Sequence, residues 1–302
     1  MESTIRTPDT SSVTVGVDGS EPARRAALWA AAEAARRSRP LHIVYGADTD
    51  GRALYASAET IEKVRAAGRE LLDDTAEAVA AEYPGLLVTT EFSRTDAVST
   101  LHRAGGLHGT IVVGHRGLGG FNSLMLGSVG LKAAAGARTP VVVVRGIGET
   151  EERGAVLAAV RDADDLVCAR YAAQEAELHK ASLRLLHVWN LFQSVGNGVT
   201  MLDEADEIAE AHAAALEAVT NAILDEFPDL TVDSDAQKST SVAGVLVEAS
   251  RRADLLVMGG RRAPTLLGLG RNLGRATHSV LHHADCPVLL IPREGTDSGS
   301  RA

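Results

Sequence analysis

The stretch TIVVGHRGLGGFNSLMLGSVGLKAAAGARTPVVVVR, residues 110–145, decides the fold. It opens on a short apolar run and crosses a loop, residues 114–128, in which five of fifteen positions are glycine. An alanine-rich segment then leads to a second apolar run, PVVVV at 140–144. A strand, a helix and a strand in this order predict a crossover between parallel strands, and continuous apolar runs are typical of strands buried on both faces. The stretch therefore predicts an α/β fold.

The same pattern recurs along the chain, in the same order and about 145 residues apart. Four pairs of stretches carry the repeat: LHIVYG (41–46) and LRLLHV (183–188), EYPGLLV (82–88) and EFPDLTV (226–232), TIVVGHRG (110–117) and LLVMGGRR (255–262), and TPVVVVR (139–145) and CPVLLIPR (286–293). Similar stretches that keep one order and nearly one offset indicate an internal duplication.

Each copy alternates short β-branched runs with long alanine-rich segments. Strands separated by helices imply right-handed crossovers and a parallel sheet that is covered on both faces. We therefore expect an α/β protein with two tandem copies of a five-stranded parallel sheet, each Rossmann-like with helices on both faces. The glycine- and charge-rich junction GIGETEERG, residues 146–154, places the boundary between a first domain at 1–147 and a second at 148–302.

The composition narrows the class of protein. A formal net charge of −10 argues against non-specific binding of nucleic acid, which needs a basic face. No apolar run approaches the ~18 residues that span a membrane, and the polar start lacks the features of a signal peptide. The two cysteines, Cys168 and Cys286, are far apart in sequence and suit a reducing cytosol. We therefore expect a cytoplasmic protein that binds neither nucleic acid nor membrane.

The glycine-rich loop leaves the carboxyl end of a strand, which is the edge where open α/β sheets bind ligands. Glycines let the backbone approach a ligand closely, and free amides at the start of the next helix favour an anion such as phosphate. Ser128, where that helix begins, can offer both its N–H and its hydroxyl. Neither the P-loop lysine nor a Gly-x-Gly-x-x-Gly after the first strand is present. The residues alone therefore predict an anion near this loop.

The spacing Gly114-x2-Gly117-x9-Gly127-Ser128 resembles the nucleotide motif of the universal stress protein family. It occurs together with VGVDGSEPA (15–23) at the first strand and RTPVVVVR (138–145) at the last. The resemblance covers nearly the whole chain as two tandem domains. It implies an adenine-nucleotide α-hydrolase-like fold and ATP, with or without Mg²⁺, at the carboxyl edge of the sheet. It also implies a regulatory role in the stress response, with slow ATP hydrolysis at most and no dedicated catalytic residue.

The resemblance also assigns the residues of the site. These are Gly16 and Gly46 beside the adenine, Asp18 as acceptor from the ribose or adenine, Val113 and Gly114 on the ribose side, and Gly117, Gly127, Ser128 and Val129 at the phosphates. A purely structural role of these residues is the alternative interpretation. Asp-Gly-Ser is ordinary turn and cap chemistry, and a glycine-rich loop can be a tight connection only.

The second copy departs from this motif. At the place of Asp18 it has Val160 or Arg161, depending on the register. Arg262 replaces the middle glycine, Arg275 replaces the serine, and the spacing between the outer glycines is two residues longer. We therefore expect little or no ATP binding in the second domain, and a role in pairing or regulation. Its four loop arginines form either an altered anion site or a solvated loop: Arg261, Arg262, Arg271 and Arg275.

Two other classes of function stay open: an interaction module that needs no nucleotide, and a slow ATPase on the same fold. His278 and His282 have a spacing that suits zinc, but the sequence offers no convincing third ligand, so we expect no metal site there. The last strand of each half is apolar and suits a sheet edge. By the resemblance, the two halves pair through these strands, whereas a homodimer, the protein partner and the choice between ATP and a cyclic nucleotide are left open.

Overall fold

The computed structural model describes residues 12–52, 56–106, 109–117, 127–145, 152–190, 202–260 and 273–292. Within these residues the strands are β1 (Val13–Gly16), β2 (Leu41–Gly46), β3 (Val88–Ser93), β4 (Thr110–Gly114), β5 (Val141–Val144), β6 (Ala155–Ala159), β7 (Ser182–Trp189), β8 (Val232–Lys238), β9 (Leu255–Gly260) and β10 (Val288–Pro292). The helices are α1 (Glu21–Arg36), α2 (Thr49–Arg52), α3 (Ala58–Glu82), α4 (Ala97–Gly105), α5 (Ser128–Gly136), the 3-10 turn η1 (Ala163–Asp165), α6 (Leu166–His179), α8 (Leu202–Glu226), α9 (Val242–Ser250) and α10 (Arg275–His283).

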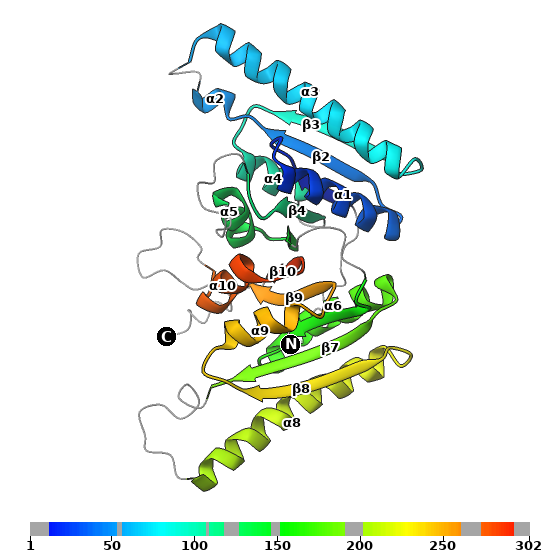
Figure 1. Cartoon of the computed structure of the whole chain (residues 1–302), viewed down its shortest axis with the longest axis vertical. Coiled ribbons are helices and arrows are strands. Elements are labelled where there is room, and N and C mark those ends of the chain that lie inside the picture. Colours follow the sequence, from blue (N-terminus) through cyan, green and yellow to red (C-terminus); the bar gives the residue numbers. More distant parts are fainter. Residues whose placement is uncertain are drawn as a thin grey trace, which may run out of the picture.

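These strands form one sheet in the order β3-β2-β1-β4-β5-β10-β9-β6-β7-β8. Neighbouring strands are parallel within each repeat, which confirms the two predicted five-stranded parallel units. At the centre β5 and β10 pair antiparallel, with Leu289 opposite Val142. The two apolar strands that were expected to be edges therefore cover each other and join the repeats (Figure 1).

Helices cover both faces of the sheet. On one face lie α1, α3, α6 and α8, and on the other lie α4, α5, α9 and α10. Side chains of each strand alternate between these layers: in β4, Val112 packs into the first layer, whereas Ile111 and Val113 pack into the second. Both faces of the strands are thus buried, which accounts for their continuous apolar sequence.

Alanine lets the helices lie close to the sheet. The buried stripe of α1 includes Ala23, Ala26, Ala27, Ala30, Ala31 and Ala34, at the spacing of three and four residues that aligns one helix face. The helix follows Ser20, whose hydroxyl accepts a hydrogen bond from the N–H of Ala23 at 3.3 Å, and a proline occupies its first turn. Its start lies against the end of β4, because a Cβ on Gly114 would be 2.7 Å from the carbonyl oxygen of Pro22.

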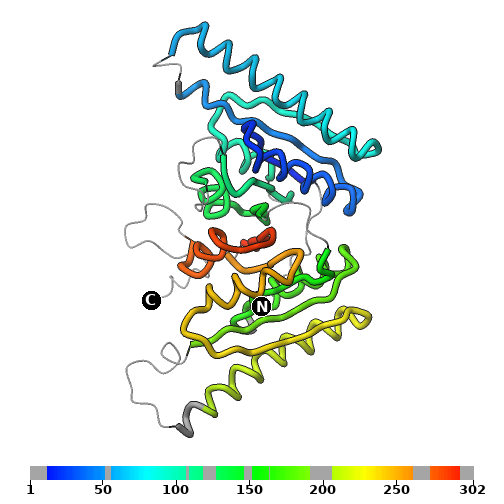
Figure 2. Tube along the Cα trace, viewed as in Figure 1, coloured from blue at the N-terminus to red at the C-terminus, as the bar shows by residue number. Residues whose placement is uncertain are grey.

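The two repeats lie end to end along the long axis of the molecule, with β5 and β10 side by side in the middle (Figures 1 and 2). The helices α3 and α8 lie at opposite ends. In Figure 1 the arrowheads of β2, β3, β7 and β8 point to the same side, so these strands of both repeats end on one side of the molecule. Residues 146–151 lie outside the described part, so the division at 147 stays a prediction.

Candidate functional site

The turn after β1 directs Asp18 toward the loop that follows β4. Gly19 has a φ of +85°, a backbone conformation that favours glycine, and Asp18 Oδ1 accepts a hydrogen bond from the N–H of Ser20 at 3.0 Å. A Cβ on Gly117 would overlap Asp18 Oδ2. The structure therefore brings the acidic residue of the first strand and the middle glycine of the motif into contact, although they are far apart in sequence.

Packing requires two glycines of the predicted site and constrains a third. A Cβ on Gly46 would lie 2.6 Å from Ala97 Cα, and one on Gly114 would lie 2.7 Å from the carbonyl oxygen of Pro22. Such distances clash with backbone, so α4 and α1 could not begin where they do. A Cβ on Gly16 would lie 3.0 Å from a methyl carbon of Leu101, which is tight but involves a side chain. These glycines therefore shape the edge of the sheet whether or not a ligand is bound.

Gly127 is different, because packing does not require it to be glycine. It is the N-cap of α5 with φ −63° and ψ 149°, a conformation open to any residue, and a Cβ there would meet Arg116 Cα at an ordinary 3.5 Å. Its N–H donates to the carbonyl of His115 at 2.9 Å, which joins the two ends of the loop. No described side chain caps the helix. The amides of its first turn, from Ser128 and the exposed Val129, are thus suited to an anion.

Cationic groups surround the base of the same loop. Burial, together with the charges of Arg145 and Arg116, lowers the pKa of His115 to about 4, so the imidazole is neutral at pH 7. Its Nδ1 lies 3.3 Å from the carbonyl oxygen of Val144. Arg116 Nε is buried and has no hydrogen-bond partner among the described residues. A buried guanidinium donor of this kind suits a phosphate oxygen.

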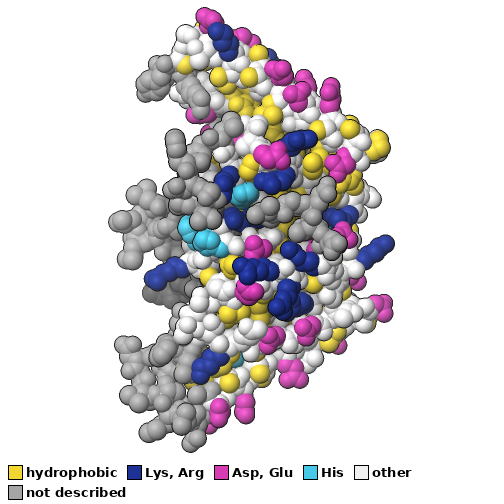
Figure 3. Space-filling model, viewed as in Figure 1, with side chains coloured by type: hydrophobic (Ala, Val, Ile, Leu, Met, Phe, Trp, Pro, Cys, Tyr) yellow, Lys and Arg dark blue, Asp and Glu magenta, His cyan; other side chains and the backbone are white. Residues whose placement is uncertain are grey.

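The sequence prediction missed His115 and Arg116, although both stand inside the glycine motif as GHRG. Their chemistry depends on burial and on Arg145, which comes from β5. The basic character is local in a chain of net charge −10. On the face drawn in Figure 3, Lys and Arg gather mainly over the middle of the molecule, whereas Asp and Glu are frequent toward both ends.

The remaining predicted residue, Val113, has a buried side chain that is 4% exposed and packs in the core. Only its backbone could therefore face a ligand. Loop residues 118–126 lie outside the described part of the chain, so the structure describes the two ends of the glycine motif and not its middle.

The pairing of strands settles the register of the second copy. The N–H of Val160 donates to Leu186 O, as that of Val17 donates to Val44 O, so Arg161 takes the place of Asp18. Asp165 Oδ2 accepts from both the backbone N–H and the Nε of Arg161, at 2.9 and 3.1 Å. An internal ion pair thus occupies the place where the first repeat offers a carboxylate.

The helix start of the second copy keeps its geometry. Gly274 is the N-cap of α10 with φ −60° and ψ 155°, and no described side chain caps this helix either. Arg275, exposed at the first position of α10, stands where α5 has Ser128. Arg261, Arg262 and Arg271 lie outside the described residues, so the altered anion site stays a hypothesis.

Within the described ranges, no helix has the length and apolar character that crossing a bilayer requires.

Comparison with known proteins identifies one family twice. The model of the universal stress protein family matches residues 10–145 and 153–292. The universal stress protein Rv2624c of Mycobacterium tuberculosis (strain H37Rv) is 28% identical over 289 residues, which cover 95% of this chain and 98% of that protein. A universal stress protein of Mycolicibacterium smegmatis is 27% identical over 288 residues, which cover 92% and 96%.

Solved structures share the fold over nearly the whole chain. The crystal structure of a universal stress protein from Archaeoglobus fulgidus DSM 4304 matches with a TM-score of 0.67 at 17% identity, and the match covers 95% of this chain and 97% of that one. A functionally unknown protein, PA1789, from Pseudomonas aeruginosa PAO1 matches with a TM-score of 0.61 at 19% identity. At 17–19% identity these matches show only that the tandem fold is shared.

Proposed function

The chain belongs to the universal stress protein family, and from this premise we propose that its first repeat binds ATP at the carboxyl edge of β1 and β4. Occupancy of this site then regulates how a cytoplasmic stress-response protein meets its partners. Hydrolysis is slow at most, because no described residue near the loop forms a nucleophile–base relay.

The observation that carries the proposal is the start of α5. An N-cap glycine that packing does not require leaves the first turn without a side-chain cap, and Arg116 Nε is buried nearby without a hydrogen-bond partner among the described residues. Amide and guanidinium donors together match the oxygens of a polyphosphate. A phosphate there would satisfy donors that these residues leave open.

The acidic group fits the other end of the nucleotide. Asp18 is oriented by its bond from Ser20, and Oδ2 lies against Gly117 at the mouth of the loop. Ribose hydroxyls and the adenine amino group are donors, so a carboxylate is a suitable acceptor. Gly16 and Gly46 end the two neighbouring strands β1 and β2, beside which the adenine would lie.

The second repeat is proposed to serve pairing instead. Its carboxylate position is taken by Arg161, which is already paired with Asp165, and its last strand joins the repeats. We thus propose that the two units have different roles. Unit 1–147 binds the nucleotide, and unit 148–302 pairs with it through its last strand. A module in which neither repeat uses nucleotide is the alternative that the experiment separates.

The direct test is to identify the small molecule released from freshly purified, heat-denatured protein. We expect ATP or ADP at close to one per chain, and calorimetric binding of ATP to the stripped protein. Gly117→Val should abolish binding, because the added side chain overlaps Asp18 and closes the mouth of the loop. If no nucleotide is released and millimolar ATP gives no heat of binding, the nucleotide-independent module is the better description.

A milder variant separates the phosphate site from general damage. Arg116→Gln should weaken ATP binding by roughly tenfold or more, since a charge-assisted hydrogen bond is worth about 1.5–3 kcal/mol. Arg24→Gln is the matched control, because Arg24 is exposed on α1 and, among the described residues, forms an ion pair only with Glu21, at 3.9 Å. Equal affinities of the two variants would remove Arg116 from the site.

A further inference from the structure

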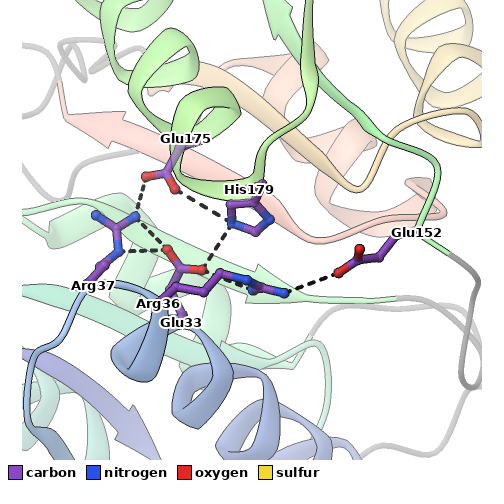
Figure 4. Close-up of polar contacts among 6 residues, drawn as sticks. All are labelled: Glu33, Arg36, Arg37, Glu152, Glu175 and His179. Carbon is purple, nitrogen blue, oxygen red and sulfur yellow. Dashed lines mark hydrogen bonds and ion pairs between the residues drawn. The ribbon is translucent and has the colours of Figure 1, made fainter.

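The junction between the repeats buries a cluster of ionisable side chains where α1 meets α6 (Figure 4). The two helices repeat each other position by position: AALWAAAEAARR at 26–37 matches CARYAAQEAELH at 168–179. Glu175 therefore takes the place of Glu33, and His179 takes the place of Arg37. The duplication has brought two carboxylates face to face, with exposures of only 1% for Glu33 and 5% for Glu175.

Each carboxylate divides its two oxygens in the same way. Arg37 Nε donates to Oε1 of Glu33 at 2.6 Å, and its Nη2, which lies 2.6 Å from the same oxygen, donates to Oε1 of Glu175. The Oε2 atoms point to the other side, toward His179. His179 Nε2 lies 3.1 Å from Oε2 of Glu33 and 3.9 Å from Oε2 of Glu175 (Figure 4). Arg36 also approaches Oε2 of Glu33, at 3.5 Å.

The arrangement leaves one oxygen without a hydrogen bond. Glu175 Oε2 is buried and has no hydrogen-bond partner among the described residues. Such an oxygen is costly in a protein interior and points to a missing partner. A cavity of about 20 Å³, enough for one water, adjoins Glu33, Arg37 and Glu175.

We propose that Glu33, Glu175 and His179 bind one divalent transition-metal ion, Zn²⁺ by preference, across the junction of the two repeats. One donor atom from each residue lies within 4.8 Å of the others. Carboxylate oxygens and imidazole nitrogens are both zinc ligands, and a site with three protein ligands takes a water as the fourth.

Two of the three separations between the donor atoms are already close to those around a bound ion. Ligand bonds of about 2.0–2.2 Å set neighbouring donor atoms of a tetrahedral site roughly 3.4 Å apart. The present separations of 3.1 and 3.9 Å from His179 Nε2 bracket that value. Arg37 keeps its bonds to the Oε1 atoms, so it remains on the far side of both carboxylates and holds them in place as a partner of the ligands. Bound zinc would tie α1 to α6.

The test is a zinc titration of the full chain after removal of nucleotide and treatment with a chelator. We expect one Zn²⁺ per chain by calorimetry, a higher unfolding midpoint with zinc, and a visible Co²⁺ spectrum typical of four-coordinate binding. His179→Gln and Glu175→Gln should each weaken binding by roughly tenfold or more. Because nucleotide is absent, the outcome is independent of the ATP proposal.

A second histidine pair supplies the control. His278 and His282 on α10 have their Nε2 atoms 3.4 Å apart and could bind added zinc themselves. The double variant H278Q/H282Q should keep the tight site. Loss of zinc in that variant, unchanged binding in both His179→Gln and Glu175→Gln, or no binding by the unaltered chain at millimolar zinc would each overturn the proposal. Should His179→Gln fail to fold, Glu175→Gln, which keeps an oxygen for Arg37, decides alone.

Discussion

At the scale of single residues, burial of His115 beside the glycine-rich loop makes the free energy of unfolding depend on pH. Its pKa is about 4 in the folded chain, from burial and the nearby arginines, against an ordinary 6.5. Between these values the unfolded chain binds the proton more strongly than the folded one. His115 therefore lowers the free energy of unfolding as the pH falls from about 6.5 toward 4, and it has no such effect above that window.

We expect His115→Gln to remove part of this dependence. In urea titrations the variant should lose less stability than the unaltered chain between pH 7 and pH 5. His283→Gln is the control for the loss of a histidine, since His283 is exposed on α10. If the three proteins lose stability in parallel, then the folded chain does not keep His115 neutral.

At the scale of elements, Gly46 allows the start of α4 to lie close to the end of β2. The start of α4 leaves no room for a Cβ on Gly46, which would sit 2.6 Å from Ala97 Cα. Gly46→Ala should therefore lower the free energy of unfolding by about 1–3 kcal/mol, the usual effect of overpacking. Gly85→Ala is the matched control, because a Cβ there meets nothing within 4 Å. A neutral Gly46→Ala in urea denaturation would mean that α4 shifts freely.

The elements were the part of the fold that the sequence predicted best. Apolar runs and regularly spaced alanines predict which side chains are buried, because the strand and helix periods determine which side chains share a face. The constant offset between the copies then predicted the topology. The sequence could not predict which residue after β6 corresponds to Asp18. Only the hydrogen bond from the N–H of Val160 to Leu186 O shows that it is Arg161.

The charged junction was missed for a related reason. A glutamate in an alanine-rich helix normally lies on the solvated face. Glu33 and Glu175 become a site only when α1 and α6 face each other, which no local pattern states. The signal that could have found them is the matched pair WAAAEAARR and YAAQEAELH, in which the same position in both copies holds a glutamate.

At the scale of the whole molecule, Arg145 links the repeats beyond the strand pairing. It follows β5 in the first repeat, yet it donates to Ala284 O at 3.0 Å and to Leu281 O at 2.9 Å, the last carbonyls of α10 in the second. A cation at a helix carboxyl end satisfies open acceptors and suits the helix dipole. The stability of α10 therefore depends on the other repeat.

Arg145→Met should expose that dependence. We expect faster hydrogen exchange over residues 275–283 and a loss of about 1–3 kcal/mol in the free energy of unfolding, since charge-assisted bonds to buried carbonyls are removed. Arg138→Met, at an exposed position before β5, is the control. Equal exchange of α10 in both variants would show that the strand pairing alone holds the repeats together.

The antiparallel pairing of β5 with β10 within one polypeptide also alters what evolution can do at the junction. In an assembly of two identical chains, every substitution arises in both copies, so equivalent positions on the two sides of the two-fold axis always carry the same residue. Covalent linkage of the halves removes that constraint. A substitution in one repeat can then leave Arg37 and His179 at equivalent positions, so that an asymmetric centre forms between two halves of common origin.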